Sequence, residues 1–177
     1  MRRPGVGQPT ARDDTCVKPL RRSVAAVHIE VDDLSRAAVR ALIGEHLSDM
    51  YAESPAESVH ALDLDALRKP DVTFWTAWSG PNLLACGALK ELNPSEGELK
   101  TMRTAAAARG QGVGAAMLAH LLHEAAARGY RRVSLETGTQ PYFAAARRLY
   151  ARHGFVECGP FAGYVEDPFS TFMTREL

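Results

Sequence analysis

Hydrophobic and polar residues alternate with a period of two in several short stretches of the chain, which is typical of half-buried β-strands. Three of these stretches follow one another with only short turns between them, and this succession predicts a meander of three antiparallel strands. The strands predicted in this way are 24–31, 72–78, 83–91, 98–104, 130–136, 155–158 and 169–177.

Two later segments have the helical period of 3.6 residues. Apolar residues recur on one face from Gly112 onward, and the pattern stops at residues 128–129, where a glycine can end a helix. Residues 141–153 predict a second helix, which Gly154 ends. The two helices enclose the strand predicted at 130–136.

The early part of the chain has a weaker helical pattern. Asp32 or Asp33 is expected to cap a helix that runs to about His46. Residues 47–69 are polar and predict one or two short helices or a long loop, and loops of this length are often functional. The expected order is strand, helix, short helices, three strands, helix, strand, helix and two strands.

Length and composition indicate one domain with a real core. The chain has 177 residues, of which 46% are hydrophobic, and no apolar run approaches the roughly 18 residues of a membrane span. Residues 1–20 mix Gly, Pro, Thr, Asp and Arg without a period, so we expect a disordered extension followed by one domain at 21–177. Basic residues at the N-terminus precede no apolar segment, and we therefore expect a cytoplasmic protein.

The charges are unevenly distributed although the formal net charge is zero. Residues 30–98 contain 13 acids and 5 bases, a net charge of 5 − 13 = −8, whereas residues 101–153 contain 8 bases and 2 acids, a net charge of 8 − 2 = +6. The basic half suits an anion, and the acidic half would attract a cation. Three widely spaced cysteines predict free thiols and neither a disulfide framework nor a metal site.

The stretch 109–114 reads Arg-Gly-Gln-Gly-Val-Gly and stands directly before the helix that begins near Gly112. Glycines at a strand-to-helix junction leave backbone N–H groups accessible at the positive end of the helix dipole. Such a site binds phosphate or pyrophosphate. A P-loop is excluded because no Gly-Lys-Ser/Thr follows.

A dinucleotide-binding Rossmann site is a second interpretation of the glycines. Gly110, Gly112 and Ala115 fit its spacing, and Glu136 ends the next strand, where a ribose-binding acid would lie. Five residues separate the preceding strand from the glycines, however, and only 177 − 136 = 41 residues remain to complete a parallel sheet. This interpretation would make the protein a nicotinamide-dependent oxidoreductase.

A third interpretation joins two motifs. The stretch 109–114 resembles the (Arg/Gln)-x-x-Gly-x-Gly/Ala motif of the GNAT superfamily of acyl-CoA-dependent N-acetyltransferases, and residues 146–155 match its A-x-x-L-Y-x-x-x-G-F signature. The resemblance covers about residues 23–177. It implies an α/β (α+β) fold with a central, mixed, mostly antiparallel twisted sheet of about seven strands, flanked by about four helices.

The resemblance also implies a binding site for acetyl-CoA, with no metal. Backbone N–H groups near Met102 would face the thioester from a strand distorted by a bulge, Arg109 would face the pyrophosphate, and Phe143 stands where many relatives carry Asn. The residues expected to bind the co-substrate are Met102, Arg103, Thr104, Arg109, Gly110, Gln111, Gly112, Val113, Gly114, Ala115, Phe143 and Arg147.

Two residues are expected to carry the chemistry. In the superfamily a glutamate eleven residues before the Arg/Gln of the motif often serves as general base, and 109 − 98 = 11 identifies Glu98. Tyr150 is the corresponding acid for the departing thiolate. Tyr51, His60 and Glu136 are expected to contact the acceptor.

The resemblance therefore implies an acyltransferase that acetylates a primary amine of a small molecule or a peptide by direct attack in a ternary complex. A non-catalytic acyl-CoA-binding or regulatory module is the alternative from another class. We expect neither nucleic acid nor membrane as a partner, and a homodimer through strand ends near the C-terminus stays open.

Overall fold

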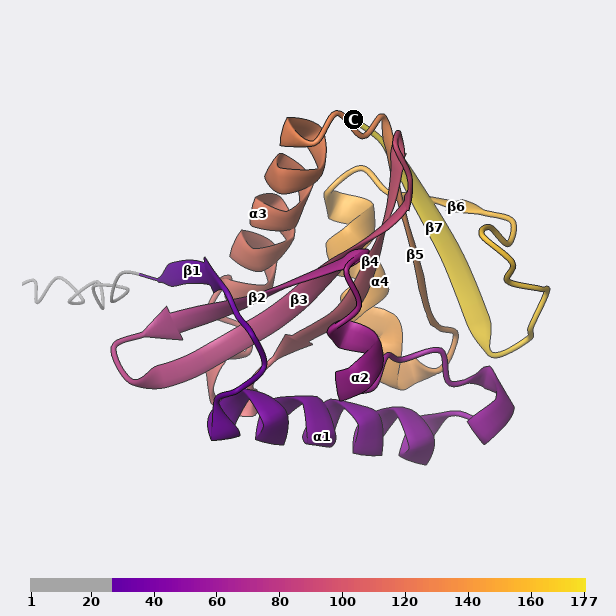
Figure 1. The fold of residues 1–177 in the computed structure, drawn as a ribbon. Coiled ribbons are helices and arrows are strands. Elements are labelled where there is room, and N and C mark those ends of the chain that lie inside the picture. The colour runs from indigo at the N-terminus through magenta and orange to yellow at the C-terminus, as the bar shows by residue number, and fades with distance from the viewer. Residues whose placement is uncertain (1–26) are drawn as a thin grey trace, which may run out of the picture.

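The computed structural model describes residues 27–177, which form one seven-stranded sheet in the order β1-β2-β3-β4-β5-β7-β6 (Figure 1). Its strands are β1 (His28–Val31), β2 (Val72–Ser79), β3 (Asn82–Asn93), β4 (Glu96–Thr104), β5 (Arg132–Gly138), β6 (Val156–Cys158) and β7 (Ser170–Glu176). The sheet is mixed and mostly antiparallel, as the resemblance implied.

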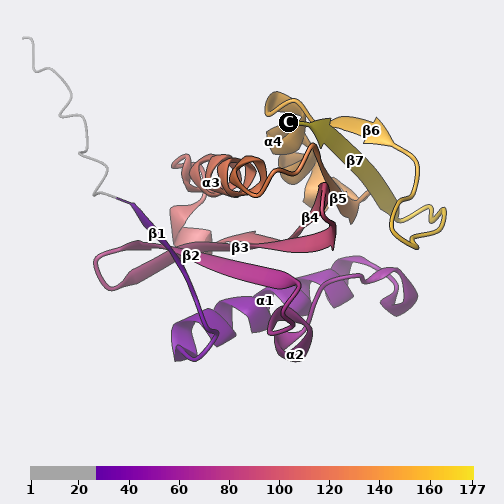
Figure 2. The same cartoon turned by 45° about the horizontal axis from the view of Figure 1, so that its top comes forward.

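Helices cover both faces of this sheet. Figure 2 shows α1 and α2 on one face and α3 and α4 on the other. The α-helices are α1 (Ala37–Glu53), α2 (Leu64–Leu67), α3 (Val113–Ala127) and α4 (Ala144–Arg152), and single 3-10 turns occur at η1 (Ala56–Ser58), η2 (Ala106–Ala108) and η3 (Pro141–Phe143). None of the helices in residues 27–177 is both long enough and apolar enough to cross a bilayer.

The extension expected at residues 1–20 lies outside the described residues, and so do the first three residues of the strand predicted at 24–31. The described part of that strand is β1. The meander predicted from the period of two is confirmed, because β2, β3 and β4 pair antiparallel in succession.

The prediction for the first helix is wrong at both ends. Leu34 has a positive φ of 65°, so the chain turns there, and the helix begins at Ala37 with no side chain capping it. The carboxylate of Asp32 instead accepts from the N–H of Leu34 and from Arg36. At the other end the helix passes His46 and continues to Glu53, two residues before a proline.

The parallel pair β4 and β5 is formed for only part of its length. Residues 96–99 of β4 pair with residues 132–135 of β5, and the last pair joins Leu99 and Leu135. β5 continues to Gly138 and β4 to Thr104, but they no longer pair with each other. The sheet therefore opens between its two central strands.

A β-bulge lies on β4 just past this point. Cys86 of β3 pairs with Arg103 and Ala88 pairs with Lys100, so that two residues of β4 oppose one residue of β3. Thr101 in this bulge has a φ of 52°, which is rare for a β-branched residue. This is the distortion that the resemblance implied for the strand before the glycines.

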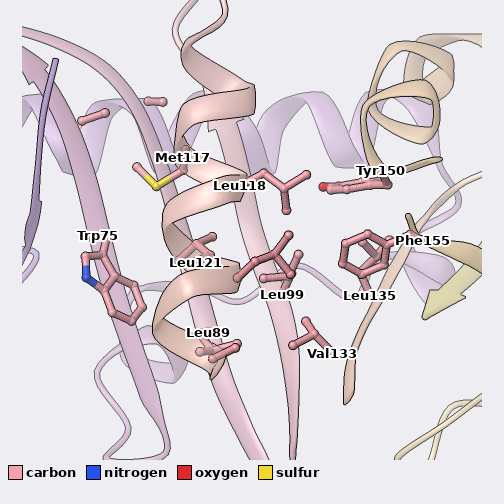
Figure 3. Close-up of a cluster of buried hydrophobic side chains, with 14 of the residues drawn as sticks. Trp75, Leu89, Leu99, Met117, Leu118, Leu121, Val133, Leu135, Tyr150 and Phe155 are labelled. Carbon is pink, nitrogen blue, oxygen red and sulfur yellow. The ribbon is translucent and has the colours of Figure 1, made fainter. Parts of the chain in front are cut away.

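Apolar side chains of the sheet pack against α3 and α4. Met117, Leu118 and Leu121 of α3 are fully buried against Leu99 and Leu135 (Figure 3). Burying one such side chain stabilises the fold by about 1.5–3 kcal/mol. This layer fixes β4 and β5 next to the first turn of α3, and it therefore positions the glycines relative to the opening of the sheet.

Candidate active site

The glycine-containing loop follows β4 and leads into α3. Gly110 and Gly112 have positive φ values of 73° and 81°, a conformation that disfavours residues with a side chain. Gly112 is the N-cap of α3, and no side chain caps this helix end. Accessible backbone N–H groups and the positive end of the helix dipole therefore meet where the sequence predicts an anion.

Gly114 and its neighbours belong to the first turn of α3. A Cβ atom on Gly114 would lie 3.1 Å from Oγ1 of Thr104, so the absence of a side chain permits close packing of α3 on the end of β4. Val113 is buried beneath this turn and Ala115 is half-buried. These residues pack on the protein side of the loop, whereas residues 109–112 are exposed.

Two polar residues of the loop are exposed and interact with its backbone. Arg109 donates from Nε to the carbonyl of Thr104 over 3.4 Å, and Gln111 donates from Nε2 to the carbonyl of Ala107 over 2.7 Å. The structure therefore brings Arg109, Gln111 and the three glycines together at one corner of the molecule. A cation and the backbone N–H groups of this corner are available to an anion.

Arg103 leaves β4 on the side of α1. Its guanidinium lies 2.6 Å from the carboxylate of Asp49 and donates to the hydroxyl of Tyr142 over 3.0 Å, and Tyr142 donates to Asp49 over 2.6 Å. The hydrogen bond from Tyr142, together with Arg103, lowers the pKa of Asp49. This ring of contacts ties α1, β4 and η3 together, beside the predicted co-substrate residue Met102.

Phe143 and Arg147 support the end of β5. The ring of Phe143 is buried and lies so close to Gly138 that a Cβ atom there would approach it to 2.2 Å. Arg147 donates to the carbonyls of Gly138 and Gln140, the latter over 3.1 Å. Both residues therefore stabilise the turn between β5 and α4.

Tyr150 of α4 is buried with its hydroxyl directed towards Leu118 of α3 (Figure 3). Its ring contacts Phe155 edge-on at 5.8 Å between ring centroids. Burial raises the pKa of Tyr150, and the negative charge of Glu136 raises it further. The phenol is therefore held protonated, as an acid for a departing thiolate must be.

Glu98 is almost completely buried, with 2% of its surface exposed. Its Oε1 atom lies 3.1 Å from Nζ of Lys100 and accepts a hydrogen bond from the hydroxyl of Tyr164 over 2.6 Å. Lys100 also donates to that hydroxyl over 2.7 Å, which closes a triangle of three polar groups. Burial and the charge of Glu98 raise the pKa of Tyr164.

Glu136 lies on the same face of the sheet, because Ser134 is paired with Glu98 and side chains two residues apart share a face. Its Oε1 atom accepts a hydrogen bond from Ser170 of β7 over 2.7 Å. Burial raises the pKa of Glu136. His60 packs edge-on against Tyr164 at 5.0 Å between ring centroids and adds an imidazole to this side of the opening.

Of the three residues predicted to contact the acceptor, the structure brings Glu136 and His60 to this buried cluster. Tyr51 lies near the end of α1 with 60% of its surface exposed, and no contact joins it to the cluster among the described residues. Neither of the two cysteines within residues 27–177 belongs to the cluster. Cys86 is buried, and burial raises its pKa to about 12, whereas Cys158 lies on β6 and is also a free thiol.

Lys100 and Tyr164 are functional candidates that the sequence analysis did not identify. Lys100 stands two residues after Glu98 on a strand, so the period of two would have placed both on one face. Tyr164 lies between β6 and β7 in a stretch without a period, and no sequence signal indicates its contact with Glu98. Within residues 27–177 no group of His, Cys, Asp or Glu side chains is arranged to bind a metal ion.

The sequence profile described as "Acetyltransferase (GNAT) family" matches residues 38–155. The chain is 52% identical to the N-acetyltransferase YsnE of Bacillus subtilis (strain 168) over 151 residues, which cover 85% of this chain and all of that protein. It is 40% identical to the IAA acetyltransferase of Azospirillum brasilense over 136 residues, which cover 76% of this chain and 86% of that protein.

Solved structures show the same arrangement of strands and helices. The crystal structure of an acyl-CoA N-acyltransferase from Klebsiella pneumoniae superposes with a TM-score of 0.73 and 30% sequence identity, covering 86% of this chain and 99% of the other. The sheet also argues against a Rossmann domain, because β4 and β5 are the one parallel pair among the strands of the described residues.

Proposed function

Because the chain belongs to the GNAT family of acetyltransferases, we propose that it transfers the acetyl group of acetyl-CoA to a primary amine by direct attack in a ternary complex. The observation that carries this proposal is the opening between β4 and β5. One end of β4 leads into the glycine-containing loop, and two carboxylates, that of the buried Glu98 and that of the half-buried Glu136, lie where the pairing of the strands ends.

The glycine-containing loop suits the pyrophosphate of acetyl-CoA. Gly110 and Gly112 expose backbone N–H groups at the N-terminus of α3, and Arg109 adds a positive charge. Beyond Leu99, β4 has no partner strand on the side of β5, and an extended pantetheine arm could pair with its backbone there. These contacts use backbone atoms, so that Phe143 in place of the family's Asn does not prevent them.

The reaction needs a neutral amine. A primary ammonium has a pKa near that of a lysine, about 10.4, and must lose a proton before its nitrogen can attack the thioester carbon. A carbon–nitrogen bond then forms, the carbon–sulfur bond breaks, and its electron pair goes to sulfur. We assign to the N–H groups in the bulge of β4 the stabilisation of the negative charge that develops on the carbonyl oxygen.

Tyr150 is the proposed acid for this step. Its phenol is protonated at neutral pH because both burial and Glu136 raise its pKa. A proton donated by Tyr150 as charge develops on sulfur gives CoA with a free thiol. The tyrosinate regains a proton from the nitrogen, which must lose a second proton as the amide forms.

The charge of the buried cluster supports a cationic acceptor. Glu98 and Glu136 carry two negative charges, whereas Lys100 supplies one positive charge. Asp49 and Arg103 neutralise each other nearby. An acceptor that arrives as an ammonium would balance the remaining negative charge.

Calorimetric titration with acetyl-CoA, with NAD and ATP in parallel, tests the co-substrate. We expect binding of acetyl-CoA alone, and binding of NAD alone would contradict the proposal. Turnover is then followed by CoA release with propylamine, spermidine, tyramine and a short peptide with a free N-terminus. Indole-3-acetic acid is included because one relative is an IAA acetyltransferase.

Acetylation of at least one amine supports the proposal, and turnover with indole-3-acetic acid alone would contradict the amine acceptor. A protein that binds acetyl-CoA but acetylates none of these compounds would favour the non-catalytic acyl-CoA-binding module. The three results therefore separate the enzyme, its acceptor class and the alternative.

A further inference from the structure

The carboxylates of Glu98 and Glu136 lie on one face of the sheet but at different places relative to its opening. Glu98 is paired with Ser134 inside the part where β4 and β5 are hydrogen-bonded. Glu136 is the residue directly after Leu135, the last residue of β5 that pairs with β4. Glu136 is therefore the first side chain on this face of β5 beyond the point where the strands separate.

Glu98 is already engaged by the protein. Its carboxylate contacts the ammonium of Lys100 and accepts from Tyr164, and these two groups also contact each other. Lys100 lies 5.4 Å from the centroid of the Tyr164 ring, which adds a cation–π contact. Taking a proton from a substrate would require Glu98 to give up an ion pair in a buried site, which is unfavourable.

Glu136 has a different environment. Its hydrogen bond comes from Ser170, a neutral hydroxyl, and its surface is more exposed than that of Glu98. Burial raises its pKa, whereas the charges of Lys100 and His60 act in the opposite direction. A carboxylate with a raised pKa is a better proton acceptor at neutral pH than an ordinary glutamate.

Glu136 is also the carboxylate whose charge acts on Tyr150, the proposed acid, and raises its pKa. The charged and titratable groups that interact electrostatically with Glu136 come from β4, α4, the segment before α2 and the segment between β6 and β7. They are Glu98, Lys100, Tyr150, His60 and Tyr164.

We propose that Glu136 binds the ammonium of the acceptor at the opening of the sheet and takes the proton that it loses, while Glu98, held by Lys100 and Tyr164, is a positioning residue. The proposal rests on the proposed function, because it assigns a base to that reaction. It differs from the sequence-based prediction, which gives the role of base to Glu98.

The step balances as follows. The ammonium gives one proton to the carboxylate of Glu136, which leaves a neutral amine and a neutral carboxylic acid. The amine attacks, the thiolate leaves with the electron pair of the carbon–sulfur bond, and the second nitrogen proton replaces the one that Tyr150 gives to sulfur. Glu136 then releases its proton to water, so that one proton is produced in each turnover.

The isosteric variants Glu136→Gln and Glu98→Gln test this assignment, with Glu157→Gln on the exposed strand β6 as the matched control. The readout is kcat/KM against pH with the fastest amine of the panel. We expect kcat/KM of Glu136→Gln to be about 100-fold lower at neutral pH. The fall of kcat/KM towards acidic pH, the acidic limb of the profile, should be absent from this variant. Glu98→Gln keeps this limb and unfolds at a lower temperature, and Glu157→Gln matches the unmodified protein.

The opposite result overturns the proposal: an acidic limb that persists in Glu136→Gln and disappears in Glu98→Gln identifies Glu98 as the base. A second measurement needs no acceptor. Carbon NMR of the glutamate carboxyl groups in the unliganded protein should show one group that titrates above the usual value of about 4.3. That signal should be absent from Glu136→Gln and present in Glu98→Gln, and the reverse pattern contradicts the proposal.

Failure of the proposed function has a different signature. The unmodified protein would then bind no acetyl-CoA or acetylate none of the amines, while its fold and its NMR titration would be unaffected. The NMR result still decides which of Glu98 and Glu136 has the raised pKa. Failure of the base assignment leaves acetyl-CoA binding and amine turnover intact in the unmodified protein.

Discussion

The two ends of the candidate site are constructed in different ways. The glycine-containing loop is one contiguous stretch, residues 109–114, and its binding groups are backbone N–H groups. The carboxylate cluster combines side chains from β4, β5, β7 and two connecting segments, between His60 and Ser170. The loop depends on which conformations the backbone can adopt, whereas the cluster depends on charges that balance in a buried place.

This difference has an energetic consequence. A strained φ costs about 1–2 kcal/mol and is independent of the rest of the chain. A buried charge that loses its partner costs about 3–5 kcal/mol, and the cost is shared by every group around it. Substitutions in the loop should therefore have small, additive effects on stability, and substitutions in the cluster should have large, coupled ones.

The largest effect is expected for Lys100→Met. The substitution leaves the carboxylate of Glu98 buried without its ion-pair partner, and we expect a loss of about 3–5 kcal/mol in the free energy of unfolding. Urea denaturation measures this loss. The double variant with Glu98→Gln should recover part of it, and losses that simply add would show that the two side chains are not coupled.

Tyr150→Phe tests the proposed acid, which interacts with the carboxylate cluster and acts on the bound co-substrate. It removes the hydroxyl of the proposed acid and keeps the ring that packs on Phe155. We expect kcat to fall about 10- to 100-fold while the calorimetric affinity for acetyl-CoA stays within about twofold. Equal turnover of the variant and the unmodified protein would exclude Tyr150 as the acid.

Gly112→Ala tests the loop, with Gly80→Ala as its matched control. Both glycines have positive φ values, 81° and 54°, and neither would bring a Cβ atom within 4 Å of a neighbour. Each variant should lose about 1–2 kcal/mol of stability. Only Gly112→Ala should also lose affinity for acetyl-CoA, by about tenfold, and an equal affinity of both variants would contradict the assignment of the loop.

The smallest effect concerns pH and His46. Burial, together with the charge of Arg103, lowers the pKa of His46 to about 4, below the ordinary value of 6.5. The unfolded chain therefore binds a proton before the folded one does as the pH falls, and stability is lost below about pH 6.5. We expect the free energy of unfolding to fall by about 1 kcal/mol between pH 7 and 5.5. Denaturation curves of His46→Gln should show a smaller fall.

The sequence was sufficient for the parts of the fold in which local and global signals agree. The strands of the meander and α3, with its glycine end, follow from the periods of two and 3.6. The start of α1 did not follow, because the positive φ of Leu34 and the contact of Asp32 with Arg36 have no local signature. Tertiary contacts decide such a boundary.

The site divides in the same way. The loop could be predicted because it contains three glycines in five residues, and glycine lowers stability unless the backbone needs a positive φ or another group approaches it closely. Glu98 and Glu136 were identified as candidates, but their different surroundings depend on Lys100, Tyr164 and Ser170, which reach them from β4, from the segment before β7 and from β7 itself. Contacts across 66 residues leave no pattern in a single sequence.

The bulge at Thr101 changes which residues of β4 face each side of the sheet. Before it, even-numbered residues such as Lys100 face α1 and the carboxylate cluster, whereas after it odd-numbered Arg103 faces α1 and Met102 packs beneath α3. If β4 ran through Thr101 without the bulge, strict alternation would turn the guanidinium of Arg103 into the apolar layer. One additional residue, accommodated in the bulge, thus keeps the polar side chains of β4 on one face of the sheet and its apolar side chains on the other.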